Sequence, residues 1–129
     1  MNARLVADHG LTINDYEALL HLARAEERRM RRVDLAERLI LTASGVTRLL
    51  DGLERAGYVE RAACASDRRV TYAVLTEAGL DKLRTASKSH ITDIRSYFES
   101  RFSSDELEQL VVLLDRLPQD ADTPDCSPD

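Results

Sequence analysis

The sequence predicts a mainly α-helical chain with a small β-hairpin wing, that is, a winged helix-turn-helix followed by long terminal dimerisation helices. Residues 1–117 contain no proline and carry apolar residues at helical spacings of three and four. Two short helical segments flank a tight turn, and two strand-like runs flank an arginine-rich loop. We therefore divide the single domain into residues 1–10 (a short N-terminal segment), 11–75 (winged helix-turn-helix), 76–117 (dimerisation helices) and 118–129 (a disordered acidic tail).

The helix-turn-helix is expected from about Asp34 to Ala56, after a first amphipathic helix that Thr12 caps. Its turn falls at Ile40 and Leu41, and Ile40 stands where many such motifs have glycine. Thr42 then caps the second helix, whose apolar stripe faces inward: Val46, Leu49, Leu50 and Leu53. Gly57 is suited to a left-handed C-terminal cap.

The opposite face of this second helix is small, hydroxylated and basic at its start, and it suits a DNA major groove. Ser44, Gly45 and Thr47 permit close approach, and Arg48 can donate to a guanine or a phosphate. An ordinary solvent-facing helix is the alternative interpretation. Asp51 on this face would repel phosphate, so we expect either that only the first turns of the helix enter the groove or that Asp51 braces Arg48 or Arg55.

A β-hairpin follows, with strands expected at Tyr58–Arg61 and Val70–Leu75. The intervening loop ends in Arg68 and Arg69, which can reach phosphates or a minor groove. We expect Asp67 to hold Arg69 by a charge-assisted hydrogen bond that shapes the wing. A surface ion pair of little energetic value is the alternative.

Two further helices are expected after the hairpin. Thr76 can cap a helix that runs to about Phe102, roughly 39 Å long. Ser103 to Glu106 form a capping box that opens a last helix, apolar on more than one side. Such a helix is expected to pack against a second chain as well as its own, which predicts a homodimer.

The charge is divided unevenly along the chain. The net charge is -5 over 129 residues, yet residues 24–69 hold 11 arginines against 8 acids. A basic middle between acidic ends is typical of a protein with one surface that meets phosphate.

The motifs together resemble the MarR family of bacterial transcription regulators. LAERLILTASGVTRLLDGLERAGYVER (Leu35 to Arg61) is similar to the family's helix-turn-helix, and Asp67, Arg69 and the run LTEAG from Leu75 are similar to its wing and the start of its next helix. The similarity extends from about Leu11 to Leu117. It implies a repressor that binds near-palindromic duplex DNA as a homodimer; a cytoplasmic location is expected separately, from the lack of an apolar run long enough for a membrane span or a secretory signal. It also assigns the DNA contacts to one set of residues: Thr42, Ser44, Gly45, Thr47, Arg48, Arg68 and Arg69.

The resemblance further implies release from DNA by a small aromatic acid. Candidates for such a pocket are Tyr16, His21 and His90, because each carries a polar group at the end of its side chain on an otherwise apolar helix. Ordinary core or surface positions are the alternative. The sequence indicates no cofactor, no metal spacing among its histidines, no catalytic motif and no membrane span. An RNA-binding or protein-interaction winged helix is the alternative function.

Overall fold

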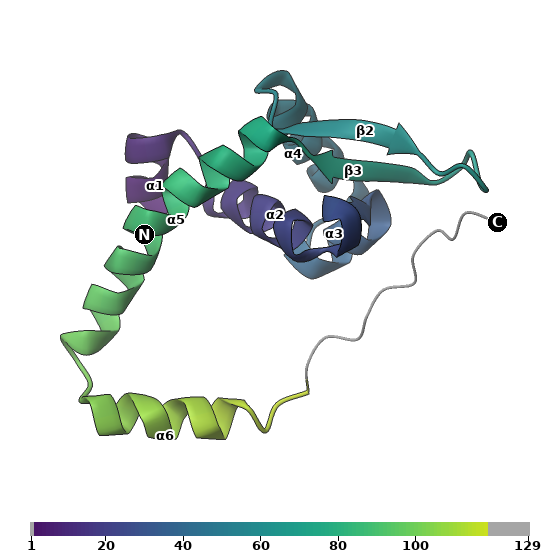
Figure 1. Cartoon of the computed structure of the whole chain (residues 1–129). Helices are drawn as coiled ribbons and strands as arrows, with labels where there is room; N and C mark the ends of the chain where they lie inside the picture. The colour runs from purple at the N-terminus through teal and green to yellow at the C-terminus, as the bar shows by residue number, and fades with distance from the viewer. Residues whose placement is uncertain (1, 119–129) are drawn as a thin grey trace.

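A computed structural model describes residues 2–118 of the chain, so the predicted acidic tail lies outside the described residues except for Pro118. Six helices, a short 3-10 turn and three strands follow one another (Figure 1). Their bounds are α1 Asn2–His9, α2 Ile13–Arg24, η1 Glu26–Arg28, β1 Arg29–Arg31, α3 Arg32–Leu39, α4 Ala43–Arg55, β2 Val59–Ala63, β3 Thr71–Leu75, α5 Glu77–Glu99 and α6 Ser104–Leu114.

The hydrophobic core lies where α2 packs against α3, α4, α5 and the sheet. Its largest fully buried side chains come from all of these layers except α5: Leu19, Leu22, Leu35, Val46 and Tyr72. The helical stripes read from the sequence therefore face one another, as an amphipathic helix requires. No helix in the described part of the chain is both long enough and apolar enough to cross a membrane.

The sheet has three antiparallel strands in the order β1-β3-β2. The hairpin is present, but β2 and β3 run from Val59 to Ala63 and from Thr71 to Leu75, so the loop is shorter than expected. Strand β1 was not predicted, because three residues with two arginines show no strand pattern. Met30 pairs with Ala73, and its side chain is buried.

Left-handed backbone occurs in several connections, among them the two that flank α4. Gly57 follows α4 with a φ of 81°, as its position after the helix predicted. Ile40 also has a positive φ, 54°, in the turn between α3 and α4. A β-branched residue is rare in this conformation. The first helix of the motif begins at Arg32, and its N-cap residue Arg31 makes no side-chain cap.

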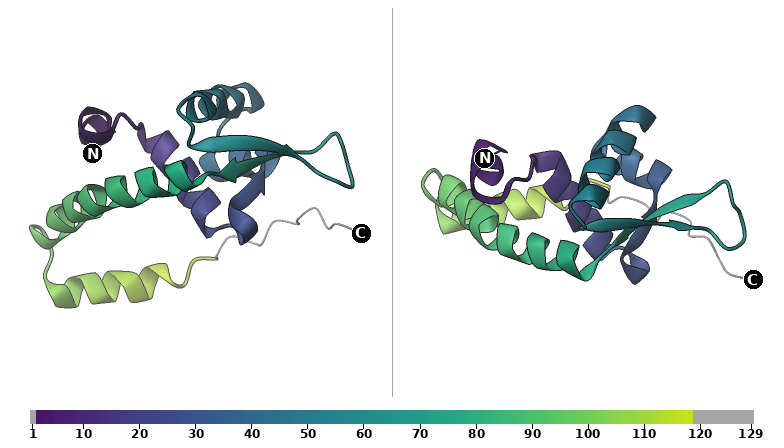
Figure 2. Two further views of the ribbon diagram at one scale, coloured as in Figure 1. Left: turned by 45° about the horizontal axis from the view of Figure 1, so that its top comes forward. Right: turned by 90° about the horizontal axis from the view of Figure 1, so that it is seen from above.

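The long helix α5 leads away from the core to α6 (Figures 1 and 2). It ends at Glu99, three residues before the predicted end at Phe102. Helix α1 packs along α5, where Arg4 pairs with Asp93 at 2.8 Å and His9 hydrogen-bonds Ser89.

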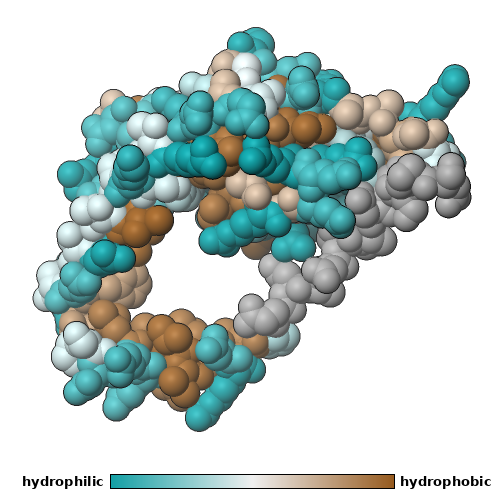
Figure 3. Space-filling view, in the orientation of Figure 1, coloured by the Kyte–Doolittle hydropathy of each residue, from teal (hydrophilic) through white to brown (hydrophobic). Residues whose placement is uncertain are grey.

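The capping box of α6 is present, but none of its residues is buried. The expectation that α6 packs against its own chain was therefore wrong. Figure 3 shows hydrophobic side chains gathered on this helix, beside an opening that α5 and α6 border.

Candidate nucleic-acid interface

Helix α4 presents the residues that the sequence singled out for DNA contact. Its apolar stripe is turned inward, with Val46, Leu50 and Leu53 buried. On the other side Thr42, Ser44 and Arg48 are exposed, and Gly45 and Thr47 are half-buried at the edges. The five candidates therefore occupy the first turns of one helix, a surface that fits a major groove.

The start of α4 is fixed by local hydrogen bonds. The Thr42 hydroxyl accepts from the Gly45 amide at 3.0 Å, which closes the N-terminal cap. A Cβ built on Gly45 would lie 3.1 Å from this hydroxyl oxygen, so a larger residue would crowd the cap. The Thr47 hydroxyl donates to the Ala43 carbonyl at 2.9 Å. Within the described residues, the Arg48 guanidinium makes no ion pair.

Arg32 is a basic residue at this surface that the sequence interpretation missed. It opens α3, and its guanidinium lies 3.4 Å from the Thr47 hydroxyl on α4. Because the two residues are 15 positions apart and on different helices, periodicity within one helix does not reveal the contact. Arg32 adds an exposed positive charge beside the predicted groove-facing residues.

Asp51 does not brace Arg48 or Arg55 through its carboxylate, which corrects the expectation from the sequence. Its carboxylate binds the guanidinium of Arg61 on β2, and Arg61 also pairs with Glu54 at 2.7 Å. Arg55 donates instead to the Asp51 backbone carbonyl. One arginine thus pairs with two acidic residues of α4, offsets one of their two negative charges and ties this helix to the first strand of the hairpin.

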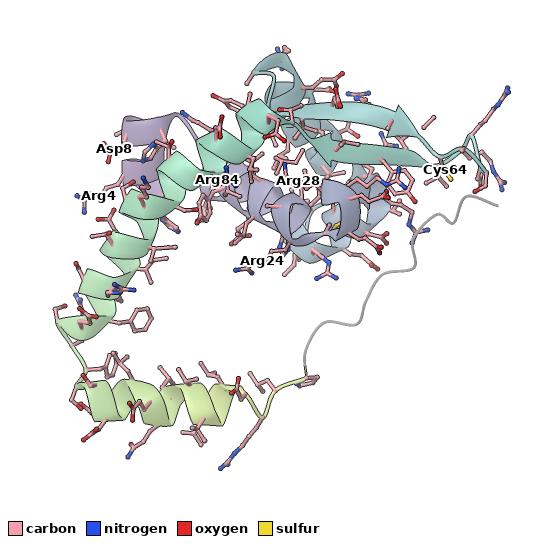
Figure 4. The ribbon with its side chains drawn as sticks, in the orientation of Figure 1. Arg4, Asp8, Arg24, Arg28, Cys64 and Arg84 are labelled. Carbon is pink, nitrogen blue, oxygen red and sulfur yellow. The ribbon has the colours of Figure 1, made fainter. Side chains whose placement is uncertain are left out.

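The hairpin extends beyond the helices as a wing (Figures 1 and 2). At the outer end of the strands, where the loop begins, the Cys64 amide donates to the Val70 carbonyl; Figure 4 labels Cys64 at this point. The Asp67 carboxylate then accepts from the Arg69 amide at 3.0 Å and from the Arg69 guanidinium at 3.2 and 3.3 Å. Arg68 is exposed, and the Arg69 side chain is 91% exposed. Both arginines can therefore meet a phosphate.

Pairing of Asp67 with Arg69 also shifts the pKa of both side chains, each in the direction that favours its charged form. The hydrogen bond from the Arg69 side chain, followed by that from its amide, lowers the pKa of the Asp67 carboxyl below its ordinary value. The same side-chain bond raises the pKa of Arg69. Both groups are therefore charged at neutral pH.

The candidate effector residues are only partly brought together. Tyr16 on α2 and His90 on α5 are buried, with ring centroids 4.6 Å apart. The Tyr16 hydroxyl forms a hydrogen bond with Ser87 at 2.9 Å. His21 is half-buried, five residues further along α2. Across the described residues, no group of three or more His, Cys, Asp and Glu side chains is placed to hold a metal ion.

Comparisons with known proteins agree on one group. Residues 9–70 match the sequence model of the MarR family. The chain is 32% identical over 108 residues to the HTH-type transcriptional repressor YetL of Bacillus subtilis, covering 84% of this chain and 64% of YetL. It is 33% identical over 107 residues to the HTH-type transcriptional regulator YkoM of the same organism, covering 83% and 68%. The chain thus spans less than two thirds of the length of YetL.

Solved structures give the same result. AbsC, a MarR family transcriptional regulator from Streptomyces coelicolor, superimposes with a TM-score of 0.77 at 35% identity over 89% of this chain and 80% of AbsC. Sco3205, a MarR family regulator from the same organism solved in complex with DNA, gives 0.80 at 29% identity over 89% and 72%.

Proposed function

The chain belongs to the MarR family of DNA-binding transcriptional regulators, which are not enzymes, and from this premise we propose that it is a repressor. The proposed protein binds near-palindromic duplex DNA as a homodimer and leaves it when a small aromatic acid binds. YetL is named a repressor, which supports the repressor role proposed for this chain. Sco3205 was solved with DNA, which supports the proposed DNA binding.

One observation carries the DNA-binding assignment: local hydrogen bonds fix the start of α4 and the tip of the wing, while the side chains of Arg48, Arg68 and Arg69 remain exposed. In the proposed complex Ser44, Gly45, Thr47 and Arg48 face base edges, and Thr42 contacts phosphate. Arg68 and Arg69 contact phosphates or a minor groove outside the major-groove site, with Asp67 shaping the wing.

The homodimer is supported by the apolar surface of α6. Val111, Val112, Leu113 and Leu114 are each at least half exposed, and Leu117 is 60% exposed. Apolar side chains exposed on more than one side of a helix are typical of an interface between chains. A twofold dimer would present two copies of α4, which explains a near-palindromic site with half-sites about one helical turn apart.

The effector is proposed to bind beside Tyr16 and His90, where α2 of the DNA-binding region meets α5. Aromatic rings with polar tips can stack on an aromatic acid and bind its carboxylate. His21 is the outer member of the proposed site. An aromatic acid such as benzoate should then weaken DNA binding, and less so in a His90→Gln variant.

Selection of bound duplexes from a random pool, with sedimentation of the purified protein, tests the proposal. We expect a dimer, a near-palindromic consensus and an affinity that falls steeply with salt concentration. Arg48→Ala should relax the sequence preference by about 1–3 kcal/mol. Arg68→Ala and Arg69→Ala should weaken binding to all sequences alike. Arg84→Ala is the matched control, because Arg84 lies on α5 away from the wing (Figure 4).

Three results would contradict the proposal: a flat salt response, no preference for palindromes, or tighter binding to RNA than to duplex DNA. The last would favour an RNA-binding winged helix. Equal effects of Arg48→Ala and Arg69→Ala on every sequence would contradict the division between base and phosphate contacts.

A further inference from the structure

The turn between α3 and α4 carries an apolar residue whose placement is unfavourable in two respects. Ile40 is 92% exposed and has a φ of 54°. An L-residue in the left-handed region is strained, and a β-branched one more so, while glycine adopts it freely. Neither core packing nor turn geometry therefore accounts for isoleucine at this position.

Ile40 does not stand alone. Val33, on the first turn of α3, is 63% exposed. Together with Ala36 they line a groove of about 540 Å³ between α3 and the start of α4. We call this surface the turn patch and define it as Val33, Ala36 and Ile40.

The turn patch is continuous with the proposed DNA-binding face. The far wall of the same groove is formed by Thr42 and Ala43, the N-cap and first residue of α4. Arg32 lines the groove as well, and its guanidinium lies 3.4 Å from the Thr47 hydroxyl. A duplex that meets Thr42 and Thr47 thus passes the patch, with Arg32 placed to bind its phosphate.

We infer that the turn patch is part of the DNA interface and that Ile40 makes an apolar contact with the duplex. The inference rests on the proposed function. The apolar groups of a duplex that a protein can reach are the C–H surface of deoxyribose and the thymine methyl group. The charged residues that line the groove are Arg32 and Glu37, one of each sign, so the partial positive charge at the N-terminus of α4 makes the groove favour an anionic ligand such as a duplex over a protein partner.

Three substitutions at Ile40 separate strain from contact. Ile40→Gly removes the strain and the side chain, and Ile40→Asn tolerates the left-handed backbone but is polar. Both variants should resist denaturant at least as well as the parent protein, yet bind the selected duplex about tenfold more weakly. Ile40→Leu should restore most of the lost affinity. Glu27→Gly is the control for strain relief alone. Glu27 has a φ of 55°, so this variant also relieves left-handed strain, and it should not weaken DNA binding.

The same duplex with uracil in place of thymine identifies the apolar group. If the parent protein loses affinity on this change and Ile40→Asn does not, Ile40 contacts a thymine methyl. If both respond alike while Ile40→Asn remains weaker overall, the contact is to deoxyribose. Both patterns support the inference.

The inference is overturned if Ile40→Gly and Ile40→Asn bind the parent's duplex as tightly as the parent does. The patch would then be free for a protein partner. Failure of the parent protein to select any duplex is a different result, because it overturns the proposed function before Ile40 is tested.

Discussion

Arg61 on β2 pairs with the carboxylate of Asp51 on α4, so the strand that leads into the wing is tied to the middle of the proposed recognition helix. Glu54, one turn further along α4, is the second partner of the same guanidinium. Both carboxylates lie on the helix proposed to approach phosphates. The positive charge of Arg61 offsets one of these two negative charges and so reduces a repulsion that would otherwise oppose binding.

We predict that Arg61→Ala lowers DNA affinity more than it lowers stability. The side chains of Arg61, Asp51 and Glu54 are each more than a third exposed, so loss of the pairs should cost less than about 1 kcal/mol of unfolding free energy. Affinity should fall about fivefold or more, because two carboxylates are unmasked and α4 is released from β2. Chemical denaturation and fluorescence anisotropy measure the two effects. An affinity loss no greater than that of Arg84→Ala would contradict the prediction.

The sequence predicted the features that depend on neighbours in the chain. The caps at Thr12, Thr42, Thr76 and Ser103 are all present, because each needs only an amide three residues away. The same holds for the contact between Asp67 and Arg69, two residues apart.

Features that depend on the register of distant segments were missed or misassigned. Strand β1 exists because Met30 meets Ala73 across the sheet, and Asp51 pairs with Arg61 because β2 returns beside α4. Local patterns carry no information about either. The sequence correctly predicted that α6 is apolar on more than one side, but it could not show that α6 lies apart from the hydrophobic core of the chain.

The wing carboxylate should titrate in an acidic range. The pKa of Asp67 in the folded chain is lowered from 3.8. Because the pKa is lowered, the pair contributes its full stability to the fold above the pKa of Asp67 in the unfolded chain. This stability is lost as the pH falls through the pKa in the folded chain. DNA binding between pH 6 and 8 should therefore show no change from this group. NMR titration of the Asp67 carboxyl should give a midpoint below 3.8, moving toward 3.8 in Arg69→Ala; a midpoint at or above 3.8 would contradict this assignment.

Ile40→Gly should stabilise the fold. Relief of left-handed strain gains about 1–2 kcal/mol, and the greater freedom of glycine in the unfolded chain offsets part of this. We expect a net gain of about 1 kcal/mol in unfolding free energy, measured by chemical denaturation. Ala7→Gly, at an exposed position inside α1, is the matched control and should destabilise. A loss of stability in Ile40→Gly would show that the turn is not strained.

Tyr16 and Ser87 should behave as one coupled pair. Their hydroxyls are 2.9 Å apart between α2 and α5, and Tyr16 is buried. Tyr16→Phe and Ser87→Ala each delete the same hydrogen bond, so each should cost about 1 kcal/mol of unfolding free energy. The double variant should cost clearly less than the sum of the two. Additive losses in this double-mutant cycle would mean that the hydroxyls do not interact.

A charge placed on α6 should dissociate the proposed dimer. Val112 and Leu113 are 61% and 52% exposed in the single chain, and burial of such side chains is worth about 1.5–3 kcal/mol each. In a twofold interface every substitution occurs twice, so Val112→Asp should raise the dimer dissociation constant at least about 100-fold. Ala78→Asp adds the same charge at an exposed position in the first turn of α5, where it favours the helix and should leave the dimer intact. Sedimentation over a range of concentrations separates the outcomes. If Val112→Asp remains as dimeric as Ala78→Asp, α6 is not the interface, and its exposed apolar surface requires a different partner.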